Sequence, residues 1–223
     1  MKSKSELFAS VNAHIISTLE RDGPPWKQPW SDVPFPNRST FPSQKAETIF
    51  DACEALIMNM PLPPAIRHEK DCLYNAHCDY VSLPRLKFFK SDLIYHLTLF
   101  HLVIRATGAP HRLDTAALLL QSGIGEEIHF LQGLVAELGA CYLAVHVGVS
   151  LDELENNIGC VRRFLESLTG EKPNLAYAQK LGERAARYVL EGAVTEIDLQ
   201  DVFKDVAVEG PVQMSKTHQH GRK

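Results

Sequence analysis

The chain has 223 residues, of which 45% are hydrophobic and 22% are charged, so it can form one globular domain with a substantial core. Its net charge of −4 argues against a protein-wide basic surface of the kind that grips duplex DNA. The five cysteines are widely spaced and form no CxxC pair, which argues against a zinc ribbon or a disulfide scaffold and favours free thiols.

The N-terminal residues lack the uninterrupted apolar stretch of a signal peptide. No apolar run approaches the length that a membrane-spanning helix needs, so we predict no membrane partner. Together with the free thiols, these features predict a cytoplasmic protein.

The first half of the chain is predicted to hold two helices and a few short strands. Apolar residues recur at helical spacing over residues 5–21, and a proline-rich segment then runs to Pro42. A second helix is predicted over residues 46–58. Strand-like stretches at residues 65–68, 72–74 and 80–83 predict a small antiparallel sheet.

The second half is predicted to be helical up to a polar tail. Ser91 suits the N-cap of a helix that ends at Thr107, and Gly108 suits its C′ position. The tail from Val194 to Lys223 shows no periodicity. Further amphipathic helices are predicted over residues 125–147, 151–168 and 174–190.

The segment Leu97–Leu113 contains a near-match to a zinc-peptidase motif. In His-Glu-x-x-His the two histidines lie on one helix face and bind one metal ion, and the glutamate takes a proton from the metal-bound water. Here the frame reads His101-Leu102-Val103-Ile104-Arg105, so the first histidine stands alone. A lone histidine on an apolar helix is more often a core residue than a metal ligand.

Two other groups of histidines could bind a metal. His101, Gly108 and His111 keep the spacing of the first histidine, the glycine and the third histidine of metzincins, but Arg105 would place a permanent charge among them. His218 and His220 lie in the polar tail, where solvated side chains are the simpler interpretation. We therefore predict no bound metal and no other cofactor.

Six stretches, in this order, resemble the ArdC-type antirestriction proteins of conjugative plasmids. They are CEALIMNMPLPP at residues 53–64, DYVSLPRLKFF at 79–89, LTLFHLVIRATG at 97–108, HRLD at 111–114, GLVAELGACYLAVHVGV at 133–149 and AYAQKLGERAARYVL at 176–190. The resemblance implies a zincin-like metallopeptidase domain, preceded in that family by a part that binds single-stranded DNA.

The resemblance also implies that the catalytic residues have been replaced. The general base of the family falls on Leu102, its second histidine on Arg105, and its third ligand on Gly133. The later acid, Glu137, is kept. We expect Glu137 to contact His101 or Arg105, because a buried carboxylate needs a partner.

The N-terminal segment departs from the family in a second way. TLERDGPPWKQPW at residues 18–30 resembles the opening of the DNA-binding part, but the sheet that follows it in the family is missing. Two interpretations remain. The aromatic and basic side chains could bind single-stranded DNA weakly, or the tryptophans could anchor the arm to the core. The candidates for DNA contact are Trp26, Lys27, Trp30 and Arg38, with Phe41 as a further stacking surface.

These observations predict an α+β, mainly helical protein with a zincin-like metallopeptidase domain, a small antiparallel sheet and a helical C-terminal part. The predicted division is a truncated arm at 1–45, a degenerate zincin-like domain at 46–192 and a tail at 193–223. The function they favour is that of a non-catalytic, ArdC-like antirestriction protein of mobile DNA. It would bind a protein partner, such as a host defence complex, or a nucleic acid. The alternatives are a small single-stranded-DNA-binding protein and a metallopeptidase with an unorthodox site.

Overall fold

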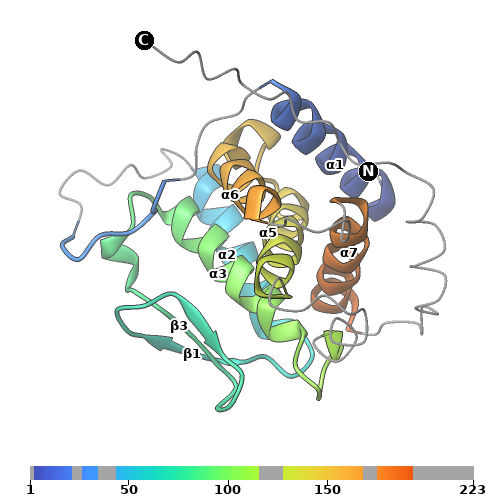
Figure 1. Cartoon of the computed structure of the whole chain (residues 1–223). Coiled ribbons are helices and arrows are strands. Elements are labelled where there is room, and N and C mark those ends of the chain that lie inside the picture. The colour runs from blue at the N-terminus through green and yellow to red at the C-terminus, as the bar shows by residue number, and fades with distance from the viewer. Residues whose placement is uncertain (1–2, 22–26, 35–43, 116–127, 168–174, 193–223) are drawn as a thin grey trace, which may run out of the picture.

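The computed structural model describes residues 3–21, 27–34, 44–115, 128–167 and 175–192, which form a helical body with a small sheet at one side (Figure 1). The α-helices are α1 (Lys4–Glu20), α2 (Gln44–Asn59), α3 (Asp92–Thr107), α5 (Ile128–His146), α6 (Glu155–Ser167) and α7 (Leu175–Glu191). Short 3-10 turns, η1 (Leu86–Phe88) and η2 (Leu151–Leu154), precede α3 and α6. Every predicted helix is present, with ends within three residues of the prediction except at the start of α6, where a 3-10 turn occupies the first four predicted residues.

Helix α5 is the centre of the body, because it packs against α1, α3, α6 and α7. Almost every side chain from Leu131 to Ala144 is buried, since apolar residues occupy all faces of this helix. By length and composition α5 could cross a membrane, so the prediction that no apolar run is long enough was wrong. However, 72% of its most apolar window is buried inside the protein, as in the core helix of a globular body.

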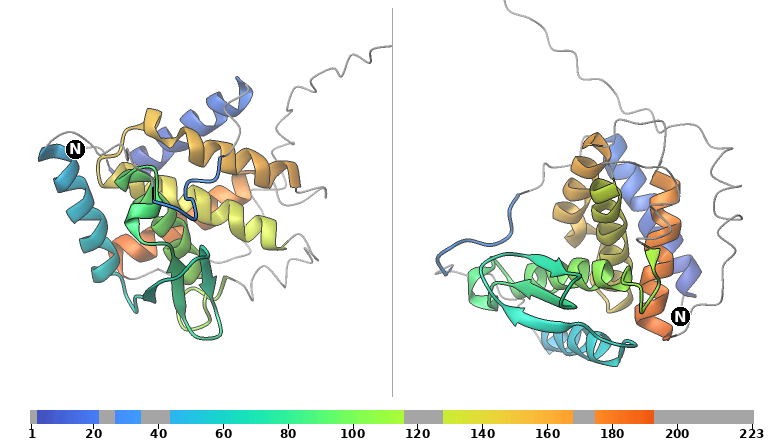
Figure 2. Two further views of the ribbon diagram at one scale, coloured as in Figure 1. Left: turned by 90° about the vertical axis from the view of Figure 1, so that its left-hand side faces the viewer. Right: turned by 60° about the horizontal axis from the view of Figure 1, so that its bottom comes forward.

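Helix α3 lies between α5 and the sheet (Figure 2). Its start is as predicted, since the Ser91 hydroxyl accepts a hydrogen bond from the backbone N–H of Ile94 at 3.2 Å. Its end differs from the prediction. Gly108 is the C-cap with a φ of −71°, and is not a left-handed C′ residue. A Cβ atom there would lie 2.8 Å from the Thr115 hydroxyl, so this position needs glycine for space.

The sheet consists of β1 (Ala65–His68), β2 (Leu73–Asn75) and β3 (Tyr80–Leu83) in the order β1-β3-β2. The prediction of an antiparallel sheet was wrong for one pair: β2 is antiparallel to β3, whereas β1 is parallel to it. The central strand β3 is the buried one, and its Val81 and Leu83 are fully covered. Strand β2 therefore forms one edge of the sheet, on the side that faces α3.

Helix α1 belongs to the same core as the other helices. Ser3 and Glu6 form a capping box at its start, which satisfies free backbone N–H groups of the first turn. Its Phe8, Val11 and Ile15 are fully buried, and the Phe8 ring lies 4.7 Å from that of Tyr142 on α5. Residues 4–20 thus pack as part of the helical body. The predicted division at residue 45 stays a prediction.

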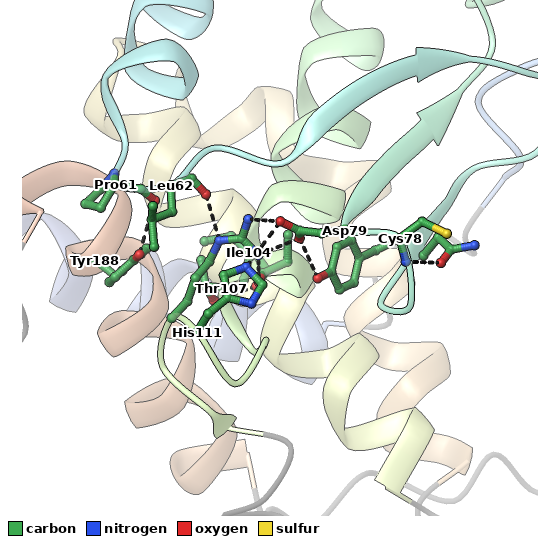
Figure 3. Close-up of polar contacts among 12 residues, drawn as sticks. Pro61, Leu62, Cys78, Asp79, Ile104, Thr107, His111 and Tyr188 are labelled. Atoms are coloured by element: carbon green, nitrogen blue, oxygen red, sulfur yellow. Dashed lines mark hydrogen bonds and ion pairs between the residues drawn. The ribbon is translucent and has the colours of Figure 1, made fainter.

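Asp79, which Figure 3 labels, ties the sheet to the loop that follows α3 through a buried arginine. The fully buried side chain of Arg112 donates hydrogen bonds to both carboxylate oxygens of Asp79, each at 2.8 Å. It also donates to the carbonyl oxygens of Leu62, at 2.8 Å, and Ala106, at 2.9 Å. The Tyr74 hydroxyl donates to Asp79 at 2.8 Å. We call Asp79, Arg112 and Tyr74 the Asp79 clamp. It joins three separate segments on one side of α3.

A close contact between α5 and α7 leads to the first prediction. A Cβ atom on Gly182 would lie 3.1 Å from the Cβ of Leu138 and 3.2 Å from two backbone atoms of α5. Alanine favours a helix over glycine by about 1 kcal/mol, but the backbone of a packed helix cannot yield easily. We expect Gly182→Ala to lower the free energy of unfolding by roughly 1–3 kcal/mol in a urea titration. An unchanged or increased stability would contradict this close packing.

Candidate functional site: a zincin-like cleft

A cavity of about 860 Å³ lies where the zinc-peptidase motif was expected. Helix α3 contributes Leu97, His101, Leu102 and Arg105 to its wall, and α5 contributes Glu137. The edge strand β2, the start and middle of α6, and Pro29 and Trp30 of the N-terminal segment complete it. Its volume lies within the range of small-molecule binding sites, which is roughly 300–1,000 Å³. The cavity is therefore large enough for a small ligand.

The acid Glu137 holds the single remaining histidine of the motif. Its Oε2 atom lies 2.6 Å from Nδ1 of His101, as predicted. An ionised carboxylate can only accept, so Nδ1 carries the proton of this hydrogen bond and Nε2 is left for other contacts. Oε1 of Glu137 accepts a hydrogen bond from the Asn157 amide, also at 2.6 Å. Glu137 thereby joins α5 to α3 and α6.

The other predicted partner of Glu137 does not contact it. Arg105 is half-buried on the same face of α3, one turn after His101, and makes no hydrogen bond or ion pair with another described residue. The Glu137 carboxylate instead accepts hydrogen bonds from His101 and Asn157. Of the two predicted partners, His101 is therefore the one that Glu137 contacts. Burial lowers the pKa of Arg105, which still remains a cation at neutral pH.

The residues at the positions of the base and the third ligand offer no replacement chemistry. Leu102 is 3% exposed and has no group that could accept a proton. At Gly133, a Cβ atom would lie 2.5 Å from ring carbons of Phe164. The ring of Phe164, from α6, thus lies against Gly133 where a ligand side chain would have to start. These residues do not fit a catalytic zinc ion, which needs about three protein ligands and an activated water.

The metzincin-like alternative was wrong. Nε2 of His111 lies 3.2 Å from the Asp79 carboxylate at the Asp79 clamp, and His111 does not line the cavity of His101. Across the described ranges, no group of three or more His, Cys, Asp or Glu side chains is arranged to hold a metal ion. His218 and His220 lie outside the described residues.

The N-terminal segment touches the cavity instead of standing free. Trp30 is half-buried, its ring lies 6.1 Å from that of Phe89, and the two residues form an isolated antiparallel bridge. The Lys27 side chain is exposed, and its backbone N–H donates to the Asn156 side chain at 3.1 Å. For Trp30 this geometry favours anchoring over base stacking. Trp26, Arg38 and Phe41 lie outside the described residues.

Several residues of the site were not foreseen from the sequence. They all come from α6, whose apolar periodicity predicts a helix but not which helix it faces. Burial, reinforced by the nearby Glu137, raises the pKa of the Cys160 thiol. Arg163 lies over the Phe164 ring at 5.1 Å. The residues in question are Asn157, Cys160, Arg163 and Phe164.

The chain was compared with known families and structures. The family model of the zincin-like metallopeptidase MPTase-PolyVal matches residues 44–180, which is more than half of the chain. No curated protein sequence matches the chain. Similar solved structures include the manganese-bound antirestriction protein ArdC from plasmid R388, at 24% identity and a TM-score of 0.46, over 66% of this chain and 53% of that one. The metal-free form of ArdC matches at 21% identity and a TM-score of 0.38, over 80% of this chain and 54% of that one.

These matches span about half the length of the ArdC chains. The family match covers α2, the sheet, α3, α5 and α6, and ends within α7. It includes the frame from His101 to Arg105 and the Glu137 carboxylate. The predicted zincin-like domain is thus confirmed, and the chain belongs to the zincin-like metallopeptidase family MPTase-PolyVal.

Proposed function

We propose that this chain is a non-catalytic member of the zincin-like family that acts by binding a partner, as an ArdC-like antirestriction protein. The observation that carries the proposal is a cavity beside a motif whose catalytic base and metal ligands have been replaced. The cavity keeps about 860 Å³, and the hydrogen bond between Glu137 and His101 is intact. The apolar side chain of Leu102 occupies the position of the base, and the cation Arg105 occupies that of the second ligand.

The losses at the site remove independent requirements of zinc-dependent hydrolysis. Without a base beside the first histidine, no group takes the proton of the attacking water. With Arg105 in place of a ligand, a permanent positive charge would repel the metal. With Phe164 against Gly133, a third ligand would also need a rearrangement of α6. Restoring one of these features alone cannot restore the reaction.

The second prediction is that the purified protein contains no stoichiometric zinc and cleaves no casein, with or without added zinc. Metal content is measured by mass spectrometry, and cleavage by release of labelled peptides. The double variant Leu102→Glu with Arg105→His serves as a comparison, and it should also stay inactive because Gly133 supplies no ligand. One equivalent of tightly bound zinc that is lost in His101→Ala would overturn the proposal.

The antirestriction role is tested separately in cells. Unmodified plasmid DNA is introduced into a restricting host with and without expression of the chain, and surviving transformants are counted. We expect more survivors when the chain is present and no difference in a host without restriction. Equal survival in the restricting host would refute this role, but it would leave the non-catalytic assignment untouched.

A further inference from the structure

The cavity contains a cation that no described side chain neutralises. Arg105 lies in the wall of the cavity, half-buried, and forms no ion pair with another described residue. Glu137, the acid that lines the cavity from α5, contacts His101 and Asn157 instead. A guanidinium that has lost part of its hydration is stabilised by an anion that offers two oxygen atoms. The anion that pairs with Arg105 is therefore none of the described side chains.

The charges around the cavity are divided along α6. Exposed Asp152 lies in the 3-10 turn before this helix and exposed Glu155 is its first residue. Arg163 lies two turns later, roughly 12 Å along the axis from Glu155. Arg163 and Phe164 line the same cavity as Arg105. The acidic rim therefore lies at the start of α6, while the second arginine of the cavity lies two turns further along.

The remaining wall determines what the anion is attached to. Leu97, Leu102 and Phe164 give the cavity apolar surface, and its volume suits a body of several carbon atoms. His101 lines the cavity from one helical turn away, on the same face of α3 as Arg105. A carboxylate has a single negative charge and two oxygen atoms, which match one guanidinium, and an apolar group attached to it matches the rest of the wall.

We propose that the cavity binds a carboxylate carried on an apolar group, with Arg105 as its counter-ion. This inference rests on the proposed non-catalytic function, because Arg105 occupies the position of a metal ligand. Two kinds of ligand share the chemistry: the carboxyl terminus of a peptide, and a small carboxylic acid. Arg105 then supplies the positive charge that a metal supplies in an active zincin, but it binds the ligand without activating water.

The test measures binding by calorimetry to the full chain in the presence of a chelator. The probes are the N-acetylated tripeptide alanyl-alanyl-leucine as the free acid, the same tripeptide as its C-terminal amide, and isocaproate, which has the apolar group and the carboxylate alone. We expect the free acid to bind, and the amide to bind at least about tenfold more weakly. A tripeptide that binds more tightly than isocaproate identifies a peptide terminus as the ligand, and equal binding identifies a small acid.

Substitutions of Arg105 test whether this residue is responsible for the binding. Arg105→Met should weaken the free acid at least about tenfold, and Arg105→Lys should give an intermediate loss, since lysine keeps the charge without the planar fork. Arg85→Met, at an exposed arginine outside the cavity, is the matched control and should bind as the unaltered chain does.

Three results would overturn the inference. They are equal binding of acid and amide, full binding by Arg105→Met, and no binding of any probe at concentrations on the order of 10 mM. Binding that is seen without the chelator and is absent in its presence would place the carboxylate on a metal, which also contradicts a role for Arg105. Stoichiometric zinc in the protein before chelation would count against the proposed function. The role of Arg105 would still be tested separately, by comparing the binding of the free acid to Arg105→Met and to the unaltered chain.

Discussion

Replacing Arg112 by methionine is expected to lower the free energy of unfolding by about 3–5 kcal/mol at neutral pH. The Arg112 side chain is fully buried and donates to both oxygens of Asp79 and to the carbonyl groups of Leu62 and Ala106. Methionine keeps much of the apolar stem but leaves these acceptors without their donor. The measurement is a urea titration followed by circular dichroism.

The matched control is Arg85→Met, which removes an exposed arginine without described partners and should change stability by less than about 0.5 kcal/mol. The pH dependence separates charge from packing. The hydrogen bonds from Arg112 lower the pKa of Asp79 from 3.8 to about 2. The carboxylate therefore stabilises the fold fully above its unfolded pKa and loses this contribution as the pH falls towards 2. The difference between Arg112→Met and the unaltered chain should shrink over this interval, and a constant difference would attribute the loss to packing alone.

Replacing Glu137 by alanine is expected to cost about 3 kcal/mol, although the residue performs no catalysis under the proposed function. The substitution leaves Nδ1 of His101 and the Asn157 amide without their acceptor between three packed helices. The more conservative Glu137→Gln keeps one oxygen and should cost roughly half as much. Both variants are measured by urea unfolding.

A double-mutant cycle tests whether the stability comes from the contact with His101. His101→Ala combined with Glu137→Ala should cost clearly less than the sum of the two single variants, because both remove the same hydrogen bond. Additive losses would show that the pair contributes no coupling. A Glu137→Ala variant as stable as the unaltered chain would remove the structural role altogether.

Part of the candidate site could be predicted from the sequence. The spacing of His101 and Arg105 places both on one face of a helix, and the motif around Glu137 predicted an acid opposite them. The contact between Glu137 and His101 followed from the need of a buried carboxylate for a partner, and the structure confirms it. The choice between His101 and Arg105 could not be predicted, because both lie on the same face of α3 and only the packing of α3 against α5 brings one of them to the carboxylate.

Helical periodicity, capping residues and proline breaks determined the helices and their order, because these signals act between residues close together in the chain. The replaced motif residues can likewise be read from the sequence, since they concern residue identity alone. Long-range contacts were decided only by the tertiary structure. Strand β3 inserts between β1 and β2, so the sheet is mixed. Arg112 pairs with Asp79, which lies 33 positions earlier. The ring of Phe164 lies against Gly133 through the packing of α6. Each of these contacts depends on how helices and strands pack against one another. Many side chains far apart in the sequence contribute to the free energy of that packing, so a local sequence pattern cannot predict it.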